Sequence, residues 1–164
     1  MKPILAAVLA LFLGSALAYG APPPAPEAGG TVVDEVKAER AALESERRKI
    51  VAAALDLTPE EHQKFWPVYK EYRDAMVAVA DKGMKVIFGY AEAYNAGSLQ
   101  DDKAKTLIAD WLSYEESRLK ARQTYMTKFM GALPARKVFR YFQVENKLDA
   151  IVTMDVASQV PLAD

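Results

Sequence analysis

Apolar residues recur at spacings of three and four along most of this chain, and this period constrains the fold more than any other feature. A spacing of three and four places side chains on one face of an α-helix. No segment shows the strict alternation that is typical of a half-buried strand. The sequence therefore predicts an all-α fold. Between residues 59 and 94 the repeating positions are Phe65, Tyr69, Tyr72, Met76, Val79, Val86 and Tyr90, with an interruption at Gly83.

About four helices are expected. The first covers residues 31–56, where apolar residues recur every seven positions, and the second covers residues 59–94. The third should begin after an N-cap at Ser98, and the fourth should run from Ala135 to about Ser158. Because the helices are long and their connections are short, neighbouring helices should run antiparallel, as long hairpins.

The second helix has a complete start signal and an internal proline. Thr58 can cap the helix, Pro59 suits the first helical position, and Glu61 completes a capping box. Pro67 removes one backbone hydrogen bond and clashes with the carbonyl of Gln63. We expect either a helix that bends near Pro67 or a short helix followed by a new one.

The first 30 residues have the pattern of a targeting signal followed by a spacer. Lys2 precedes an apolar run, and Ala16-Leu17-Ala18 has the form of a signal-peptidase site. The apolar run is shorter than the roughly 20 residues that span a membrane. We expect residues 1–18 to be a signal peptide cleaved near Ala18, residues 19–30 a disordered Pro/Gly-rich leader, and residues 31–164 one helical domain of a periplasmic protein.

Charge and cysteine content narrow the classes of function. The chain has no cysteine and a formal net charge of −1. The fold must therefore stand without disulfides, although export permits them. Nucleic-acid binding needs a basic excess or stripe, so nucleic acid is not an expected partner. No later apolar run reaches membrane-spanning length, so we expect no stable membrane anchor after signal cleavage.

Catalysis and metal binding find little support in the sequence. His62 is the only histidine, and no Gly-rich phosphate loop or G-x-S-x-G motif is present. Adjacent carboxylates such as Glu115 and Glu116 point about 100° apart on a helix, so they do not converge on one substrate atom. Transition metals usually recruit several histidine or cysteine ligands. We expect no enzymatic activity, no metal site and no cofactor.

Aromatic and basic side chains are the most informative candidates for a binding surface. Aromatic residues at helical spacing are usually core. However, Phe65-Trp66 and Tyr141-Phe142 are adjacent pairs, and the two members of such a pair cannot easily point into the same side of the core. We expect part of this aromatic area to meet a client or partner protein, beside a basic tract in the last two helices. The candidate surface consists of Phe65, Trp66, Tyr69, Tyr72, Arg118, Arg122, Arg136 and Arg140.

The signal peptide, the long all-α chain and the run Leu57-Thr58-Pro59-Glu60-Glu61 resemble the Spy/CpxP group of LTxxQ-motif periplasmic proteins. This chain is also similar to sensor-like proteins that are linked to extracytoplasmic-function sigma factors. Leu57, Thr58 and Leu133 match the motif, whereas Glu61 replaces its first glutamine. The resemblance implies hooked helical hairpins that form a cradle-shaped homodimer. It also implies a role as an ATP-independent chaperone, as an accessory of envelope-stress sensor kinases, or as a metal-responsive sensor.

These features lead to three hypotheses. The first is a chaperone-like or stress-response protein that binds unfolded clients or a regulatory partner on a curved helical surface. The second is a signalling accessory that docks on one envelope sensor kinase or anti-sigma factor. The third is a structural helical protein with no client. General suppression of aggregation would separate the first hypothesis from the other two.

Overall fold

The computed structural model describes residues 32–163, with side chains described from Ala41 onward. This range contains four helices and no strand, which confirms the predicted all-α fold. None of its helices is both long and apolar enough to cross a membrane. The expected signal peptide and leader lie outside the described residues. The helices are α2 (Val32–Leu55), α3 (Pro59–Asn95), α4 (Asp101–Ala132) and α5 (Ala135–Gln159).

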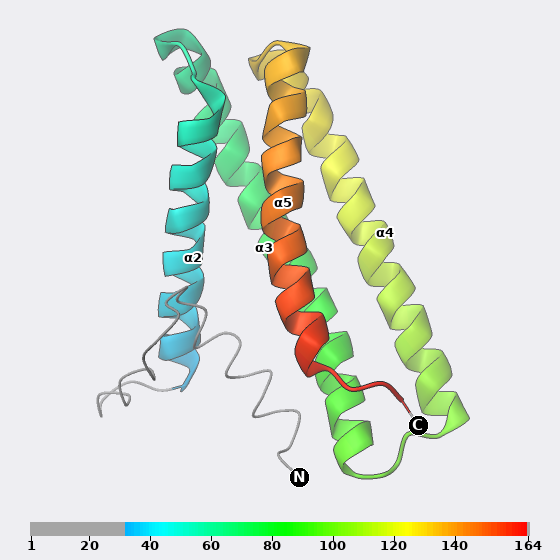
Figure 1. The fold of residues 1–164 in the computed structure, drawn as a ribbon. Helices are drawn as coiled ribbons and strands as arrows, with labels where there is room; N and C mark the ends of the chain where they lie inside the picture. Colours follow the sequence, from blue (N-terminus) through cyan, green and yellow to red (C-terminus); the bar gives the residue numbers. More distant parts are fainter. Residues whose placement is uncertain (1–31, 164) are drawn as a thin grey trace.

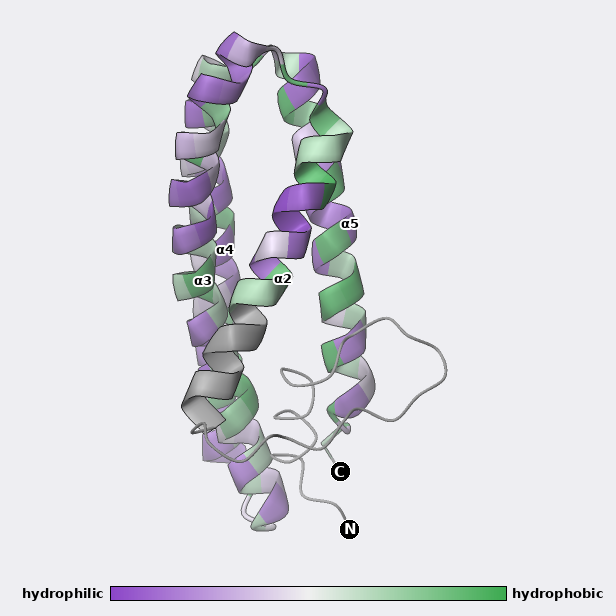
Figure 2. Cartoon of the chain, turned by 90° about the vertical axis from the view of Figure 1, so that its left-hand side faces the viewer, coloured by the Kyte–Doolittle hydropathy of each residue, from purple (hydrophilic) through white to green (hydrophobic). Residues whose placement is uncertain are grey.

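The helices form two pairs (Figure 1). α3 and α4 run antiparallel in one long hairpin, and α5 packs mainly against α2. The α2–α3 and α4–α5 connections lie at one end of the molecule, and the α3–α4 connection lies at the other (Figure 1). α5 touches α4 near their connection and then diverges from it (Figure 1). Much of α5 is hydrophobic on the side visible in Figure 2.

The predicted capping box at the start of α3 is confirmed. The Thr58 hydroxyl accepts a hydrogen bond from the backbone N–H of Glu61, and the Glu61 carboxylate accepts one from the backbone N–H of Thr58 at 2.9 Å. Pro59 occupies the first helical position. Lys137 of α5 pairs with Glu61 and donates to the carbonyl of Asp56, so the cap is also tied to α5.

Replacing Thr58 with alanine is expected to lower the free energy of unfolding by about 1 kcal/mol, because the Glu61 amide loses its acceptor. Urea denaturation followed by circular dichroism would measure the change. Thr106→Ala is a matched control, since the Thr106 hydroxyl donates to the Asp102 carbonyl inside α4 and caps nothing. An equal loss in both variants would contradict the role of the cap.

One of the two alternatives for Pro67 is excluded, and the expected N-cap of the third helix is wrong. α3 continues as one helix through Pro67, so the alternative of two helices meeting there is excluded. Ser98 does not cap the third helix, because its hydroxyl and its backbone N–H both donate to the Ala93 carbonyl at the end of α3. Gln100 is the N-cap instead. The bend at Pro67 stays a prediction.

The main core lies near the α2–α3 and α4–α5 connections and is dominated by aromatic rings. The ring centroid of Phe129 on α4 lies 4.6 Å from that of Tyr141 on α5 and 5.5 Å from that of Phe65 on α3. Edge-to-face and tilted ring pairs of this kind add about 0.5–1.5 kcal/mol each beyond their burial. The buried members are Val51, Leu55, Phe65, Tyr69, Tyr72, Met76, Phe129, Leu133, Val138, Tyr141 and Phe142.

Gly83 of α3 lies directly against the ring of Tyr114 on α4. A Cβ atom at Gly83 would lie 3.0 Å from the ring of Tyr114 on α4. The ring therefore occupies the space that any larger residue would need. This contact explains why the apolar period of α3 is interrupted at a glycine.

Candidate functional site

A network of arginines and carboxylates joins all four helices next to the aromatic core. At its centre is Glu145 of α5, whose side chain is only 1% exposed. One Glu145 oxygen accepts hydrogen bonds from Arg47 of α2 at 2.7 Å and from Arg73 of α3 at 3.2 Å. Arg73 also donates two hydrogen bonds to Glu44 of α2, at 2.8 and 2.6 Å. Such two-fold pairing fixes the orientation of the guanidinium group.

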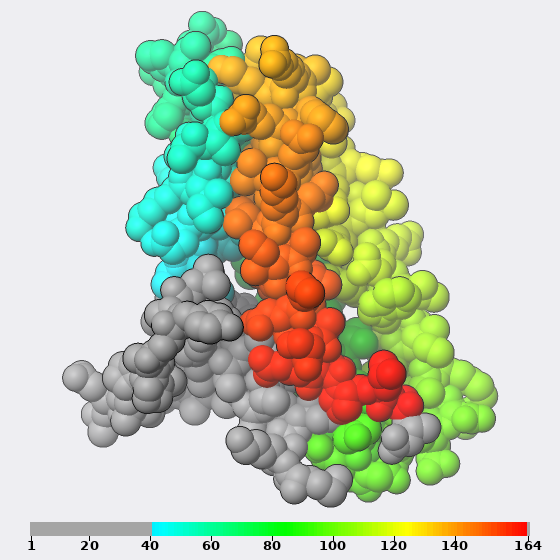
Figure 3. Space-filling model, viewed as in Figure 1, coloured from blue at the N-terminus to red at the C-terminus, as the bar shows by residue number. Residues whose placement is uncertain are grey.

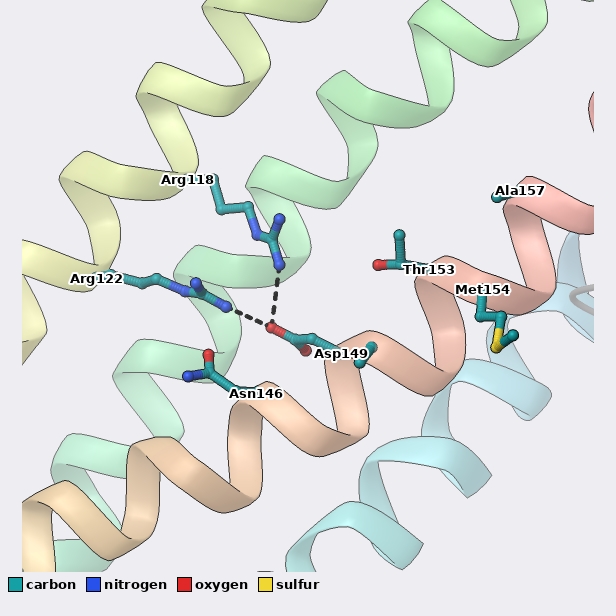
Figure 4. A pocket seen from close by; sticks show the side chains of 8 residues that line it. Arg118, Arg122, Asn146, Asp149, Thr153, Met154 and Ala157 are labelled. Atoms are coloured by element: carbon teal, nitrogen blue, oxygen red, sulfur yellow. Dashed lines mark hydrogen bonds and ion pairs between the residues drawn. The ribbon is translucent and has the colours of Figure 1, made fainter. Parts of the chain in front are cut away.

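Asp149, one turn further along α5, extends the network to α4. One of its oxygens accepts from Arg47 at 3.1 Å. The other accepts from Arg122 at 2.7 Å and lies 3.5 Å from Arg118 (Figure 4). One carboxylate is thus shared by three arginines from two helices.

The two central carboxylates respond differently to their surroundings. Burial raises the pKa of Glu145, and the guanidinium groups of Arg47 and Arg73 oppose this rise only in part. Burial also acts to raise the pKa of Asp149, but Arg47, Arg122 and Arg118 together hold it below its usual value. Asp149 is therefore ionised at neutral pH, and Glu145 takes up a proton more readily than an exposed glutamate does.

Several buried polar atoms beside the network have no hydrogen-bond partner among the described residues. They include the second carboxylate oxygen of Glu145, the Nε of Arg122 and the hydroxyl groups of Tyr69, Tyr72 and Tyr141. Within the part of the chain that the structure describes, no group of three or more histidine, cysteine or acidic residues could hold a metal ion. The four arginines also surround the central carboxylates, so the network itself would repel cations.

An open cleft of about 490 Å³ lies where α5 diverges from α4. Its floor is formed by Asp149 and its α4 wall by Arg118 and Arg122 (Figure 4). The molecular surface is hollowed between the two helices in this region (Figure 3). The rest of the lining comes from α5: Asn146, Ala150, Thr153, Met154 and Ala157.

α4 carries a line of large apolar side chains that no other described helix covers. On an ideal helix with 100° per residue, these side chains fall within about 40° of one another and extend over roughly 33 Å. We call this line the α4 stripe. Each member is 40–59% exposed, and Trp111 beside it is 52% exposed. The α4 stripe consists of Ile108, Leu112, Leu119, Met126 and Met130.

The structure separates the eight residues of the predicted binding surface. Phe65, Tyr69 and Tyr72 are buried, so their predicted exposure to a partner is wrong. The reason is that rings from α4 and α5 enclose them on the inner side of α3. Trp66 is half-buried, with the Arg48 guanidinium 4.4 Å from its ring centroid.

The four arginines of the predicted surface fall into two groups. Arg118 and Arg122 meet at the α4–α5 cleft. Arg136 and Arg140 are exposed near the start of α5 and lie outside the cleft lining.

The three motif residues take structural positions. Leu57 is half-buried against the core, Thr58 caps α3, and Leu133 is buried at the end of α4. These positions agree with a role in the fold.

Sequence reasoning missed both the buried network and the exposure of the α4 stripe. The seven-residue spacing of Leu112, Leu119 and Met126 is visible in the sequence. It indicates an apolar helix face but not whether a neighbouring helix covers that face.

No family model, curated protein or solved structure matches this chain. The resemblance to the Spy/CpxP group therefore stays a prediction.

Proposed function

We propose that this protein is an exported, non-enzymatic helical protein of the periplasm that holds partly unfolded polypeptides on the α4 stripe without nucleotide. The observation that carries this proposal is the line of five large apolar side chains, each at least 40% exposed. Contiguous exposed apolar patches mark sites of protein–protein contact in soluble proteins. The two methionines suit varied clients, because their flexible side chains adapt to different apolar shapes.

The surroundings of the α4 stripe favour weak and rapidly exchanging contact. Glu115, Glu116, Lys120 and Arg122 interrupt or flank its apolar residues, so a client meets apolar and charged groups together. The aromatic core and the buried network hold α4 in place, so the stripe does not have to reorganise on binding. The affinity for a client would come from the apolar area of the α4 stripe and not from a deep pocket.

The alternative is a signalling accessory with one specific partner. The seven-residue spacing of Leu112, Leu119 and Met126 favours it, because such spacing suits packing against another helix. That helix could belong to an envelope sensor, an anti-sigma factor or a second copy of this chain. A tight complex of fixed stoichiometry would then replace general client binding.

Light scattering of a chemically denatured client, diluted with and without the mature protein, tests the proposal. Suppression of aggregation is expected near an equal molar ratio without nucleotide. The double variant Leu112→Ser/Leu119→Ser should lose at least about fivefold in potency, since each change removes one apolar contact. Ile50→Ser is the matched control, because Ile50 is 45% exposed on α2, which packs against α5.

Two results would overturn the proposal. One is an absence of suppression at several-fold excess of the protein. The other is equal loss of potency in the double variant and in Ile50→Ser. A stable dimer that the double variant dissociates, seen by sedimentation, would favour self-pairing through the stripe.

A further inference from the structure

The cleft between α4 and α5 has more positive than negative charge in its lining. Arg118 and Arg122 face one carboxylate, Asp149, which Arg47 also shares from α2. Arg73, on α3, is directed to Glu44 and Glu145 instead. Glu115 lies 3.8 Å from Arg118, which is too long for a strong ion pair. The lining therefore retains an excess of one positive charge.

Arg118 is the arginine of the cleft lining with the longest ion pairs. Its two ion pairs, at 3.5 Å to Asp149 and 3.8 Å to Glu115, are both longer than the usual 2.7–2.9 Å. A guanidinium group has five N–H donors in a planar fork that matches a carboxylate. Figure 4 shows Arg118 extending from α4 into the space beside Asp149. An incoming carboxylate could accept two hydrogen bonds there.

The α5 wall of the cleft offers groups that suit a peptide backbone. Asn146 and Thr153 line the cleft and are exposed, and their side chains make no hydrogen bond to another described residue. They are seven residues apart, which is about 10.5 Å along the helix axis and about three residues of extended chain. Their amide and hydroxyl groups can both donate and accept. Ala150, between them, leaves room for a backbone to approach.

From this arrangement we propose that the α4–α5 cleft binds the free C-terminal carboxylate of an apolar polypeptide segment. Arg118 takes the carboxylate, with Arg122 adding charge, and Asn146 and Thr153 pair with the last peptide groups. Met126 of the α4 stripe lies four residues after Arg122 and only about 40° from it around the helix, so apolar side chains of the same segment reach the stripe. The inference rests on the proposed function for its source of polypeptide. An alkyl carboxylate would leave Asn146 and Thr153 without partners.

Fluorescence anisotropy of a labelled apolar decapeptide, titrated with the full mature protein, tests this inference. The label is at the N-terminus, and the peptide is made with either a free C-terminal carboxylate or a C-terminal amide. The free acid is expected to bind at least tenfold more tightly than the amide. Arg118→Gln should reduce this ratio below about threefold, while Arg140→Gln, an exposed arginine of α5 outside the cleft, should leave it unchanged.

Circular dichroism would confirm that Arg118→Gln is folded, and Asn146→Ala is a second variant that should lower the affinity for both peptides. Equal affinity for acid and amide would overturn the inference and leave the proposed function standing. If the unmodified mature protein neither suppresses aggregation nor binds either peptide, both this inference and the proposed function are overturned. Displacement of the peptide by decanoate at concentrations below those of the unlabelled free-acid peptide would overturn the assignment to a polypeptide.

Discussion

Replacing Glu145 with alanine is expected to lower the free energy of unfolding by about 3–5 kcal/mol, as removal of one partner from a buried ion pair does. Glu145 is 1% exposed and is the acceptor that Arg47 of α2 and Arg73 of α3 share. Without it, both guanidinium groups stay largely buried with one fewer anion. Urea denaturation followed by circular dichroism would measure the loss.

Two further variants make this prediction specific. Glu46→Ala breaks an exposed pair with Lys49 and should change stability by less than about 0.5 kcal/mol. Glu145→Gln keeps the shape of the side chain and an acceptor oxygen, so it should cost less than Glu145→Ala. A loss below about 1 kcal/mol for Glu145→Ala would show that the network adds little to stability.

Replacing Phe129 with alanine is expected to lower the free energy of unfolding by about 3–5 kcal/mol, because it leaves a cavity in the core. Phe129 is fully buried, and its ring lies against those of Phe65, Tyr72 and Tyr141. It is also the one residue of α4 that is buried in this core, against which Ala121, Tyr125 and Ala132 of the same helix pack. Thermal and urea unfolding would both register the change.

Phe139 provides a control of the same residue type. It is 66% exposed on α5, so Phe139→Ala should alter stability by less than about 0.5 kcal/mol. A similar loss in the two variants would contradict the assignment of Phe129 to the core and Phe139 to the surface. A small loss in both would mean that the aromatic cluster is not the main source of stability.

The aromatic core and the buried network together position the two proposed binding features. Phe129 and Arg122 attach α4 to the rest of the molecule through apolar and ionic contacts respectively. The α4 stripe and the cleft arginines lie on this same helix. Variants at Glu145 or Phe129 should therefore be checked for folding before any loss of binding is interpreted.

The sequence by itself determined the local structure of this protein. The three- and four-residue period predicted an all-α fold, and the capping box placed the start of α3 at Pro59. These features depend on contacts within one or two helical turns, so the local sequence contains all the information they need. Ser98 shows the limit of that reasoning, because its local bonds to Ala93 ended α3 and did not start α4.

Only the tertiary structure decided which side chains are buried and which charges meet. Tyr72 and Leu119 both follow an apolar helical period, yet Tyr72 is buried and Leu119 is 57% exposed. The described helices have more apolar faces than their α3–α4, α2–α5 and α4–α5 contacts can cover, so periodicity could not separate buried from exposed positions. Arg47 and Asp149 are 102 residues apart and still form an ion pair at 3.1 Å. Contacts of this kind depend on how whole helices pack, and no local pattern specifies that packing.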